Sequence, residues 1–550
     1  MSNYFKFTGR FLIKTAVPHS FPMGAAGSLV PYAPLFSARA VGAAAGVAPD
    51  HVWFVQPSKD AVGQTNPWDQ AHAAFQHYQS LGGTPVAYIE PDLIYNYPFD
   101  RNNGSPGLSL AAAATPCTQD PPNRNWPTKP DFAWHKGPLY TGLAAAAARL
   151  GTVTDGNRVR IVHLDTGYSR GHATLPPNLN LGLQKNFVEG SNDAADPGVQ
   201  GFLKNPGHGT GTIGILAGNT VTVGSYIDFL GGAPFADVVP VRVASSVVEF
   251  YNSTIAQGYN YATSIGADVV TLSMGGVPTQ AWADAINQAY EAGVAMFAAA
   301  GNNYSGLPTR NIVYPARFNR VVAVCGATAD YGPYKKDFPS TEMQGNFGPS
   351  QKMGTAIAAF TPNIPWAQWG CPNTIDLDGA GTSAATPQAA AAAAIWLQFN
   401  RATLSGPDFT GANAWRKVEA LRLALFATAD KSKPNSNDYF GQGLLNAAAA
   451  LEVVPSINVN KTPQDEVSFP WIKILFGVGV APSPANQMMA TELTQLIIGS
   501  PDFSTEFAQI GYEDAQVDSN TLKSLIDAVL KSNDASQTLK TYLAARRSTL

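Results

Sequence analysis

The chain has 550 residues, more than one hydrophobic core usually supports, so we expect two or three domains. Hydrophobic residues make up 45% of it, charged residues only 13%, and the formal net charge is −4, which indicates a well-buried globular protein and argues against nucleic acid as the main partner. No uninterrupted apolar stretch reaches about eighteen residues, so the sequence predicts no membrane partner.

The N-terminus and the cysteines bear on location. The first residues, MSNYFKFTGRFLIKTAV, mix basic and apolar positions and lack the separate charged and hydrophobic regions of a secretory signal. Three cysteines, Cys117, Cys325 and Cys371, are odd in number and far apart, which suits a reducing compartment. Cys325, inside the apolar run VVAVCGA, is interpreted as a buried core thiol. We therefore expect a cytoplasmic protein, with non-classical export left open.

Residues 1–128 are predicted to form a small α+β region. Alternating or apolar segments at 6–17 (KFTGRFLIKTAV), 51–57 (HVWFVQP) and 84–97 (TPVAYIEPDLIYNY) favour strands, and 68–81 favours a helix. The Pro-rich stretch ATPCTQDPPNRNWPTKPD, with the turn-rich DRNNGSPG before it, is typical of a linker.

Residues 129–455 alternate short apolar strands with Ala-rich helices. The expected strands include RVRIVHLD, ADVVPVRV, ADVVTLSM, VAMFAAAG and RVVAVCGA. Near-continuous apolar strands separated by helices predict an α/β fold, with a doubly wound, mostly parallel sheet covered by helices on both faces. Residues 456–550 lose the strand pattern and are expected to form a helical extension of unknown role.

Three short motifs carry residues suited to nucleophilic catalysis. DTG places Asp165 at the end of an apolar strand, NPGHGTGT places His208 just before a helix, and GTSAATP places Ser383 at the start of an Ala-rich helix. Each has a structural alternative: Asp165 could bond turn amides, Ser383 could cap its helix, and any one histidine could be a core residue. His163, two residues before Asp165, is interpreted as a core residue rather than a base.

Together, in the order Asp, His, Ser, these motifs resemble the subtilisin-like serine proteases, the subtilase family. The resemblance covers roughly residues 130–455 and includes GGAPFADVVPVRV, TLSMGG, AAAGNN and YPARFNRVVAVCGA in the expected sequence. It implies a serine endopeptidase that forms an acyl-enzyme from Ser383, with His208 as base and Asp165 orienting it. It also implies that Asn302 and the Ser383 N–H bind the oxyanion.

The same resemblance implies how a polypeptide substrate binds. Ser273, Met274 and Gly275 match the strand that pairs with an extended peptide, and the first specificity pocket would be lined by these residues together with Ala299, Ala300, Gly301 and Val313. Val313 stands where several members have glycine, and no charge lines these segments. We therefore expect a preference for small or medium apolar side chains on the acyl side of the cut.

Other parts of the chain depart from the family or extend its resemblance. Gly211 stands where members commonly have a second histidine and Ala384 where many have methionine, which affects packing rather than proton transfer. The resemblance implies that the chemistry needs no cofactor. No D-x-D-x-D-G loop is present, so an EF-hand-like structural calcium site is unsupported, although an irregular calcium site stays open.

The segment VAYIEPDLIYNY resembles the end of the inhibitory pro-region of many subtilases, which implies intramolecular inhibition by the N-terminal region; the alternative is a permanently attached domain. At the level of function, two alternatives to an endopeptidase stay open. One is an autoinhibited binding or regulatory protein with a subtilase fold, and the other is a peptide ligase or macrocyclase that uses the same acyl-enzyme.

Overall fold

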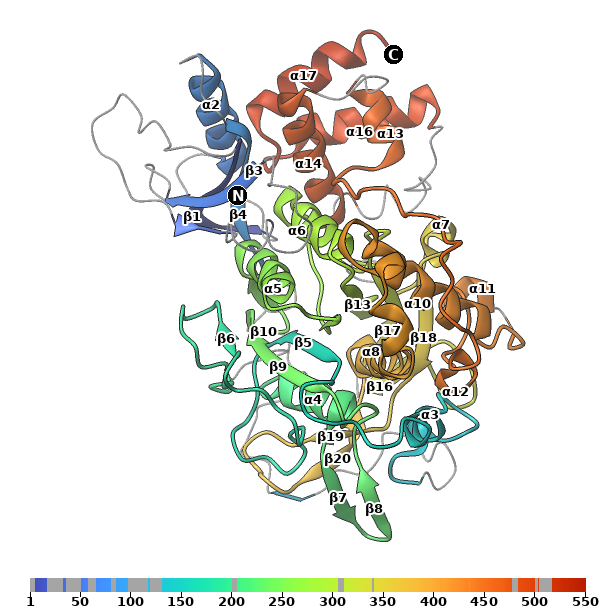
Figure 1. Cartoon of the computed structure of the whole chain (residues 1–550). Coiled ribbons are helices and arrows are strands. Elements are labelled where there is room, and N and C mark those ends of the chain that lie inside the picture. Colours follow the sequence, from blue (N-terminus) through green and yellow to red (C-terminus); the bar gives the residue numbers. More distant parts are fainter. Residues whose placement is uncertain are drawn as a thin grey trace.

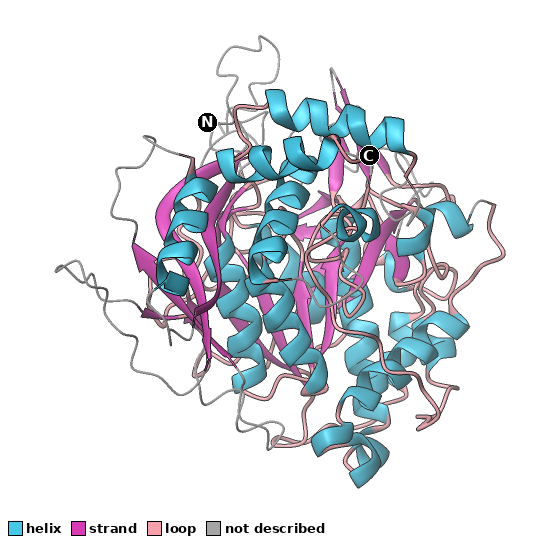
Figure 2. Cartoon of the chain, turned by 90° about the horizontal axis from the view of Figure 1, so that it is seen from above, coloured by secondary structure: helices cyan, strands magenta, loops and turns pink. Residues whose placement is uncertain are grey.

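The computed structural model describes residues 5–16, 33–35, 51–57, 66–80, 86–96, 117–118, 131–199, 205–304, 311–338, 341–434, 436–476, 483–499, 503 and 517–550. Two large sheets organise this part of the chain, one of seven strands at its centre and one of six strands that begins in the N-terminal region (Figure 1). Helices surround the strands when the molecule is seen from above (Figure 2).

The seven-stranded sheet is parallel throughout, which confirms the expected α/β class. Its inner strands are buried almost completely, as their continuous apolar runs predict. In spatial order the strands are β18 (Ala356–Phe360), β15 (Val322–Ala327), β13 (Ala295–Ala299), β12 (Val269–Leu272), β5 (Arg160–Asp165), β9 (Asp237–Arg242) and β6 (Lys185–Asn186).

The longest helix, α8 (Thr382–Phe399), lies on four strands of this sheet, β12, β13, β15 and β18. Almost all of its residues are buried, and its alanines let it approach both the sheet and the neighbouring helices closely. The other helices of this region are α3 (Leu143–Ala148), α4 (His208–Ala217), α5 (Asn252–Ser264), α6 (Gln280–Glu291), α7 (Ser350–Met353), α9 (Arg401–Leu404), α10 (Trp415–Thr428), α11 (Ser436–Tyr439) and α12 (Ala447–Ala450).

The six-stranded sheet joins the N-terminal region to the central one. Helix α2 (Pro67–Ser80) packs against it, and its strand pairs are antiparallel. The strands are, in order, β10 (Ala244–Ser246), β11 (Glu249–Tyr251), β4 (Val86–Asn96), β1 (Phe5–Ala16), β3 (His51–Pro57) and β2 (Ala33–Pro34). Strand β4 therefore adds to a hairpin of the region that carries the parallel sheet.

The C-terminal helices have a hydrophobic core of their own. It includes Phe469, Trp471, Ile526, Leu539 and Leu543 and is separate from the main core. These helices are α13 (Pro470–Leu475), α14 (Pro484–Gly499), α16 (Ser519–Lys531) and α17 (Gln537–Arg547). Figure 1 places them beside α2 and β4.

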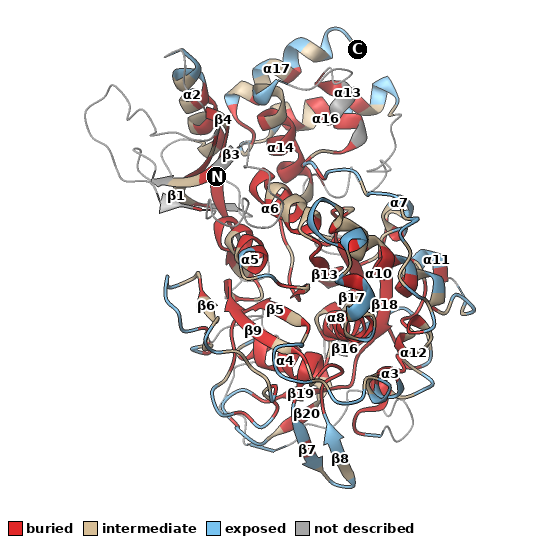
Figure 3. Ribbon diagram, in the orientation of Figure 1, coloured by how far each residue is buried: buried red, intermediate tan, exposed pale blue. Residues whose placement is uncertain are grey.

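Three small sheets complete the described structure. The hairpin of β7 and β8 reaches outward and is largely exposed, whereas the central strands are buried (Figure 3). The small strands are β7 (Thr220–Val223), β8 (Tyr226–Phe229), β14 (Asn302–Tyr304), β16 (Lys335–Phe338), β17 (Thr341–Gly345), β19 (Ile364–Ala367) and β20 (Ile375–Gly379). No helix in the described ranges is long and apolar enough to cross a bilayer.

Candidate active site

The candidate catalytic residues lie at the carboxyl edge of the parallel sheet. Strands β5 and β12 are neighbours with Leu164 paired to Leu272, so the next residues, Asp165 and Ser273, lie at the same edge. Polar residues that follow buried parallel strands reach the crevice outside that edge. The sheet therefore brings together positions that are 108 residues apart.

Asp165 and His208 form a buried hydrogen-bonded pair. The His208 Nδ1 lies 2.7 Å from the Asp165 Oδ1, which also accepts the Thr166 N–H at 2.8 Å. Burial by itself raises the pKa of Asp165, but the charge and hydrogen bond of His208 outweigh it and hold the pKa below its usual value. The carboxylate is thus ionised and fixes the imidazole with Nδ1 as the donor.

A second pair of residues contacts the Asp165 carboxylate from behind. The Thr212 hydroxyl lies 3.1 Å from Asp165 Oδ2, and His163 Nε2 lies 2.8 Å from the same hydroxyl. Burial lowers the pKa of His163 to about 4, so its ring is neutral at the pH of ordinary assays. His163 is thus the buried residue that the sequence predicted, but it supports the acid through Thr212.

Ser383 lies at the same edge of the sheet, as the second residue of α8. Its hydroxyl donates to the Ser273 carbonyl at 2.9 Å, and the Ser273 hydroxyl donates to the Ser383 carbonyl at 3.0 Å. Helices α4 and α8, which begin with His208 and Thr382, pack against each other. The sheet and these two helices thus place Ser383 beside the strand next to Asp165.

Asn302 is held against the start of α8. Its Oδ1 accepts the Thr382 N–H at 2.9 Å, and the Thr382 hydroxyl lies 3.2 Å from the Gly301 carbonyl. Gly381 has a φ of +82°, and a Cβ there would lie 3.1 Å from the Asn302 Nδ2. Glycine at this turn therefore lets the carboxamide nitrogen lie against the residue that leads into Ser383.

The residues predicted to line the specificity pocket meet around Val313. A Cβ on Gly275 would come within 2.5 Å of a Val313 methyl, and one on Gly301 within 3.0 Å of the same methyl. The Val313 N–H donates to the Ala300 carbonyl at 3.0 Å. Both glycines are thus required by the close approach of the valine, whose side chain fills the space between them. Ser273, Met274, Ala299 and Ala300 are buried beside it.

Gly211, the departure from the family pattern, is explained by Trp366 of β19. A Cβ on Gly211 would lie 2.0 Å from the Trp366 ring, so no side chain fits there. The same indole meets the His208 ring edge to face, with centroids 5.5 Å apart. A tryptophan from a distant hairpin therefore occupies this volume and packs against the histidine. Sequence analysis missed this residue.

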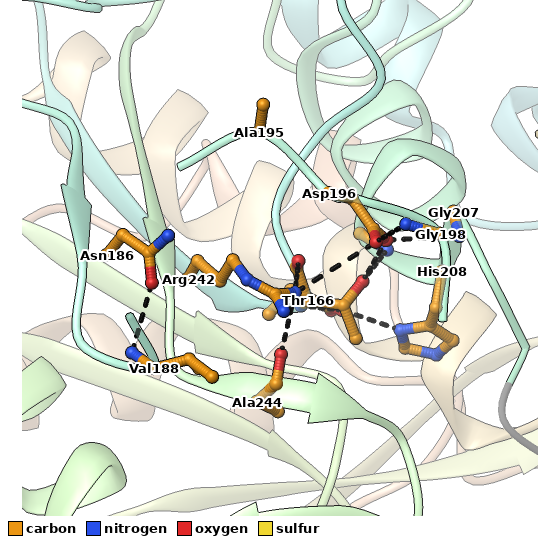
Figure 4. Close-up of polar contacts among 12 residues, drawn as sticks. Thr166, Asn186, Val188, Ala195, Asp196, Gly198, Gly207, His208, Arg242 and Ala244 are labelled. Carbon is orange, nitrogen blue, oxygen red and sulfur yellow. Dashed lines mark hydrogen bonds and ion pairs between the residues drawn. The ribbon is translucent and has the colours of Figure 1, made fainter. Parts of the chain in front are cut away.

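A polar network holds the loop that leads into His208 (Figure 4). Asp196 Oδ2 accepts the Thr166 hydroxyl at 2.8 Å and the Gly207 N–H at 3.1 Å. Arg242, whose side chain is almost fully buried, donates to the carbonyls of Thr166 and Ala244. This network ties the turn after Asp165 to the start of α4 and so maintains the acid–histidine pair.

The structure contains a disulfide that the sequence did not suggest. Cys117 and Cys371 are bonded, with an S–S length of 2.05 Å, and Cys325 is free and buried. Cys325 is thus the buried core thiol that the sequence predicted, whereas the spacing of the cysteines, interpreted as suiting a reducing compartment, gives no sign of a bond between residues 254 positions apart. Cys371 lies between β19 and β20, in the hairpin that carries Trp366.

No group of three or more His, Cys, Asp or Glu residues suited to a metal ion occurs within the described ranges. A parallel α/β sheet that has a hydrogen-bonded carboxylate–histidine pair at its carboxyl edge, with a serine at a helix start beside the next strand, is the arrangement of a serine hydrolase.

Comparison with known proteins narrows this class. A model of the subtilase family matches residues 156–443. The chain is 31% identical over 296 residues to subtilisin Savinase of Lederbergia lenta. The aligned part covers 54% of this chain and 91% of that protein. It is also 31% identical to an alkaline protease of Shouchella clausii, over 64% of that protein. It is 28% identical to subtilisin E of Bacillus subtilis, over 66% of that protein, and each of these alignments covers 54% of this chain. The chain belongs to the subtilase family and is a serine protease.

Proposed function

We propose that the protein is an endopeptidase that cleaves extended polypeptides through Ser383, His208 and Asp165. Ser383 attacks the carbonyl carbon, His208 takes the hydroxyl proton and later delivers it to the leaving amine, and Asp165 stabilises the imidazolium. The observation that carries the proposal is the buried 2.7 Å contact between His208 and Asp165 at the edge where Ser383 lies. The reaction requires the Ser383 hydroxyl to turn from the Ser273 carbonyl towards His208 Nε2, a change of rotamer.

The oxyanion would be bound by the Asn302 carboxamide and the Ser383 N–H. The latter is one of the first four amides of α8, which have no acceptor within the helix and lie at its positive end. Since Asn302 Oδ1 is engaged by Thr382, its nitrogen is the group directed to the developing charge. Each such donor lowers the barrier by about 3 kcal/mol.

We also propose that the N-terminal region inhibits the site until it is released. Two contacts support this. Strand β4 lies between β1 and β11 in the six-stranded sheet and pairs with β11, which follows the parallel strand β9, with Asn96 opposite Glu249. Glu90 accepts the Gln280 and Ala281 N–H groups, and Asp92 accepts the Ser253 N–H, at the N-termini of α6 and α5.

The carboxyl groups of Glu90 and Asp92 thus accept free backbone N–H groups at the first turns of two helices of the catalytic region, which favours association. Trp53 and Lys14 add contacts to Asp284 of α6, with the indole nitrogen at 2.9 Å and the ammonium at 2.7 Å. The N-terminal region thus binds the catalytic region through a shared sheet, two helix ends and one buried indole. A cut in the linker would leave these contacts in place.

The disulfide argues against the cytoplasmic location that the sequence led us to expect. Disulfides persist in oxidising compartments, so the bond between Cys117 and Cys371 favours the alternative that was left open, export of the protein from the cytoplasm. We propose that the mature enzyme works outside the reducing cytosol. Isolation from its native source and a non-reducing peptide map would show whether the bond is present there.

The central test is the Ser383→Ala variant. Casein hydrolysis should fall to background while the circular-dichroism melt stays close to that of the wild type, because only one oxygen is removed. A fluorophosphonate probe should label the wild type at Ser383 and leave the variant unlabelled. Undiminished hydrolysis by the folded variant would disprove the assignment. Probe labelling without hydrolysis, or transfer of the acyl group to added amines in preference to water, would favour the binding or ligase alternative.

A further inference from the structure

The C-terminal helices contact the N-terminal region as well as the catalytic one. Helix α14 meets α2 and β4 through three buried polar contacts. The Trp68 indole N–H donates to Gln495 at 3.0 Å, and the Tyr88 hydroxyl donates to Thr491 at 2.7 Å. The third, between His72 Nε2 and Glu492, measures 3.1 Å.

All the side chains in these contacts are almost fully buried. Buried polar groups that lose their partners cost free energy, so the face of α14 is matched to α2 and β4 rather than to solvent. Glu492 is the clearest case, since its carboxylate is buried and its other donors are the N–H and hydroxyl of Ser536. His72 is therefore the residue of the N-terminal region that completes the surroundings of Glu492.

A further carboxylate of the N-terminal region lies at a helix N-terminus of the C-terminal unit. Asp69 accepts the N–H groups of Gln537 and Thr538 at 3.0 and 3.2 Å, at the first turn of α17. The Asn66 amide adds a bond to the Asp534 carbonyl at 2.7 Å. The N-terminal region thus binds helix N-termini on both sides: Glu90 and Asp92 accept N–H groups of catalytic helices, and Asp69 accepts those of α17.

Gln495 links all three parts of the chain. Its carbonyl oxygen accepts from Trp68 and its amide nitrogen donates to the Pro278 carbonyl at 2.9 Å. Pro278 precedes α6, whose first amides are bound by Glu90. The Asp465 carboxylate, just before α13, accepts the Asn319 and Arg320 N–H groups, which anchors the C-terminal unit to the catalytic region.

We propose that the C-terminal helical unit, residues 484–499 and 517–550, is a clamp that retains the N-terminal region on the catalytic region after the linker has been cut. The proposal rests on the inhibitory role proposed above and assigns its regulation: activation is set by release from the clamp rather than by the cut. The unit suits this role because it has its own core and anchors, while one face of it is built from contacts to α2 and β4.

The test uses the full chain and a clamp variant, Trp68→Phe combined with Tyr88→Phe. Tyr88→Phe keeps its ring and removes only the hydrogen bond to Thr491, whereas Trp68→Phe removes the hydrogen bond to Gln495 together with part of the buried indole ring. The control is Tyr542→Phe, a matched change within the clamp whose ring packs on Phe476 rather than on the N-terminal region. Size exclusion after self-cleavage, with the Cys117–Cys371 bond reduced, measures how long the N-terminal fragment stays bound, and a peptide substrate measures the activity of each fraction.

The wild type and Tyr542→Phe should keep the fragment bound after the cut, whereas the clamp variant should release it at least about tenfold faster. Equal release rates in all three proteins would overturn the clamp. The inhibitory role is judged separately: if the cut enzyme with the fragment still bound is as active as the enzyme without it, inhibition is wrong whatever the release rates.

A second measurement does not depend on the cut. In the Ser383→Ala background, amide hydrogen exchange in α2 and β4 should be faster in the clamp variant than in the control, because these elements are then held by fewer contacts. Exchange that is unchanged in both elements would overturn the proposal even in a chain that never cleaves itself.

Discussion

The specificity pocket that the family resemblance implies offers the sharpest test of how the enzyme would select its substrate. Val313 lies between Gly275 and Gly301, whose added Cβ atoms would come within 2.5 and 3.0 Å of its methyl. Val313→Gly removes three carbon atoms from this space and leaves the flanking glycines in place. The opened volume should accept two or three more methylene groups of a substrate side chain.

Each buried methylene contributes about 0.8 kcal/mol, so the gain for a Phe or Leu substrate over an Ala substrate should be about 2 kcal/mol. That free energy corresponds to about a 30-fold shift in the ratio of kcat/KM values. Val313→Ala should give a smaller shift in the same direction. The melting temperature of the glycine variant should fall, since a half-buried side chain is lost and glycine gains freedom in the unfolded chain.

The assay is a tetrapeptide library varied only at the residue on the acyl side of the cut, with kcat/KM measured for wild type and both variants. Wild type should favour Ala, Val, Leu or Met over Arg, Lys, Asp and Trp, because none of the residues matched to the pocket, Ser273–Gly275, Ala299–Gly301 and Val313, carries a charge. A strong wild-type preference for Arg or Lys would refute the assignment of the pocket. The absence of any shift towards larger side chains in the glycine variant would refute the role of Val313.

Further predictions concern the oxyanion donor, the support of the acid and the thiols. Asn302→Ala should lower kcat about 10²- to 10³-fold with a smaller change in KM, and an unchanged kcat would remove this residue from the site. Thr212→Val should lower kcat up to about tenfold by removing a donor to Asp165, whereas the control Thr263→Val, whose hydroxyl bonds only within α5, should leave kcat unchanged. Native protein should show no reactive thiol at pH 8, because burial raises the pKa of Cys325 to about 12; unfolding should expose one thiol and reduction all three, and three thiols without reduction would disprove the disulfide.

Much of the central fold could be predicted because it depends on local patterns. The segment 267–274 contains β12 at Val269–Leu272, and 320–327 contains β15 at Val322–Ala327. The strand β18, with the sequence AIAAF, was not predicted. Alanine favours helices, and this segment is extended because it pairs with β15, whose partner residues are 33 positions earlier in the chain (Ala323 with Ala356). Such pairing leaves no mark in the segment itself.

The candidate site likewise contains residues that local sequence patterns predicted and residues that were missed. Asp165, His208 and Ser383 were found from short motifs, since each is flanked by the small residues that its turn or helix start requires. Thr212 follows His208 by four residues on one helix, and His163 precedes Asp165 by two on one strand, so both spacings place the side chains on the same face. These spacings could have revealed the support of the acid.

Trp366 could not be found in this way. It reaches His208 from a hairpin more than 150 residues away in sequence, and the only local trace is the missing side chain at Gly211. A glycine inside a helix is unfavourable by about 1 kcal/mol relative to alanine, so its presence in α4 requires a close approach by another group. The departure from the family at this position is therefore one half of a packed pair.

The disulfide limits where a cut can free the N-terminal region. Cys117 lies within the Pro-rich stretch that the sequence offers for cleavage, and its partner Cys371 lies in the catalytic region. A cut before residue 117 leaves the N-terminal region held by non-covalent contacts: β4, the helix ends, the contacts of Trp53 and Lys14 to Asp284, and the proposed clamp. A cut after residue 118 leaves it covalently attached until the bond is reduced, whatever the clamp contributes. Release under non-reducing conditions therefore requires the earlier cut, in the stretch that follows β4 and precedes Cys117.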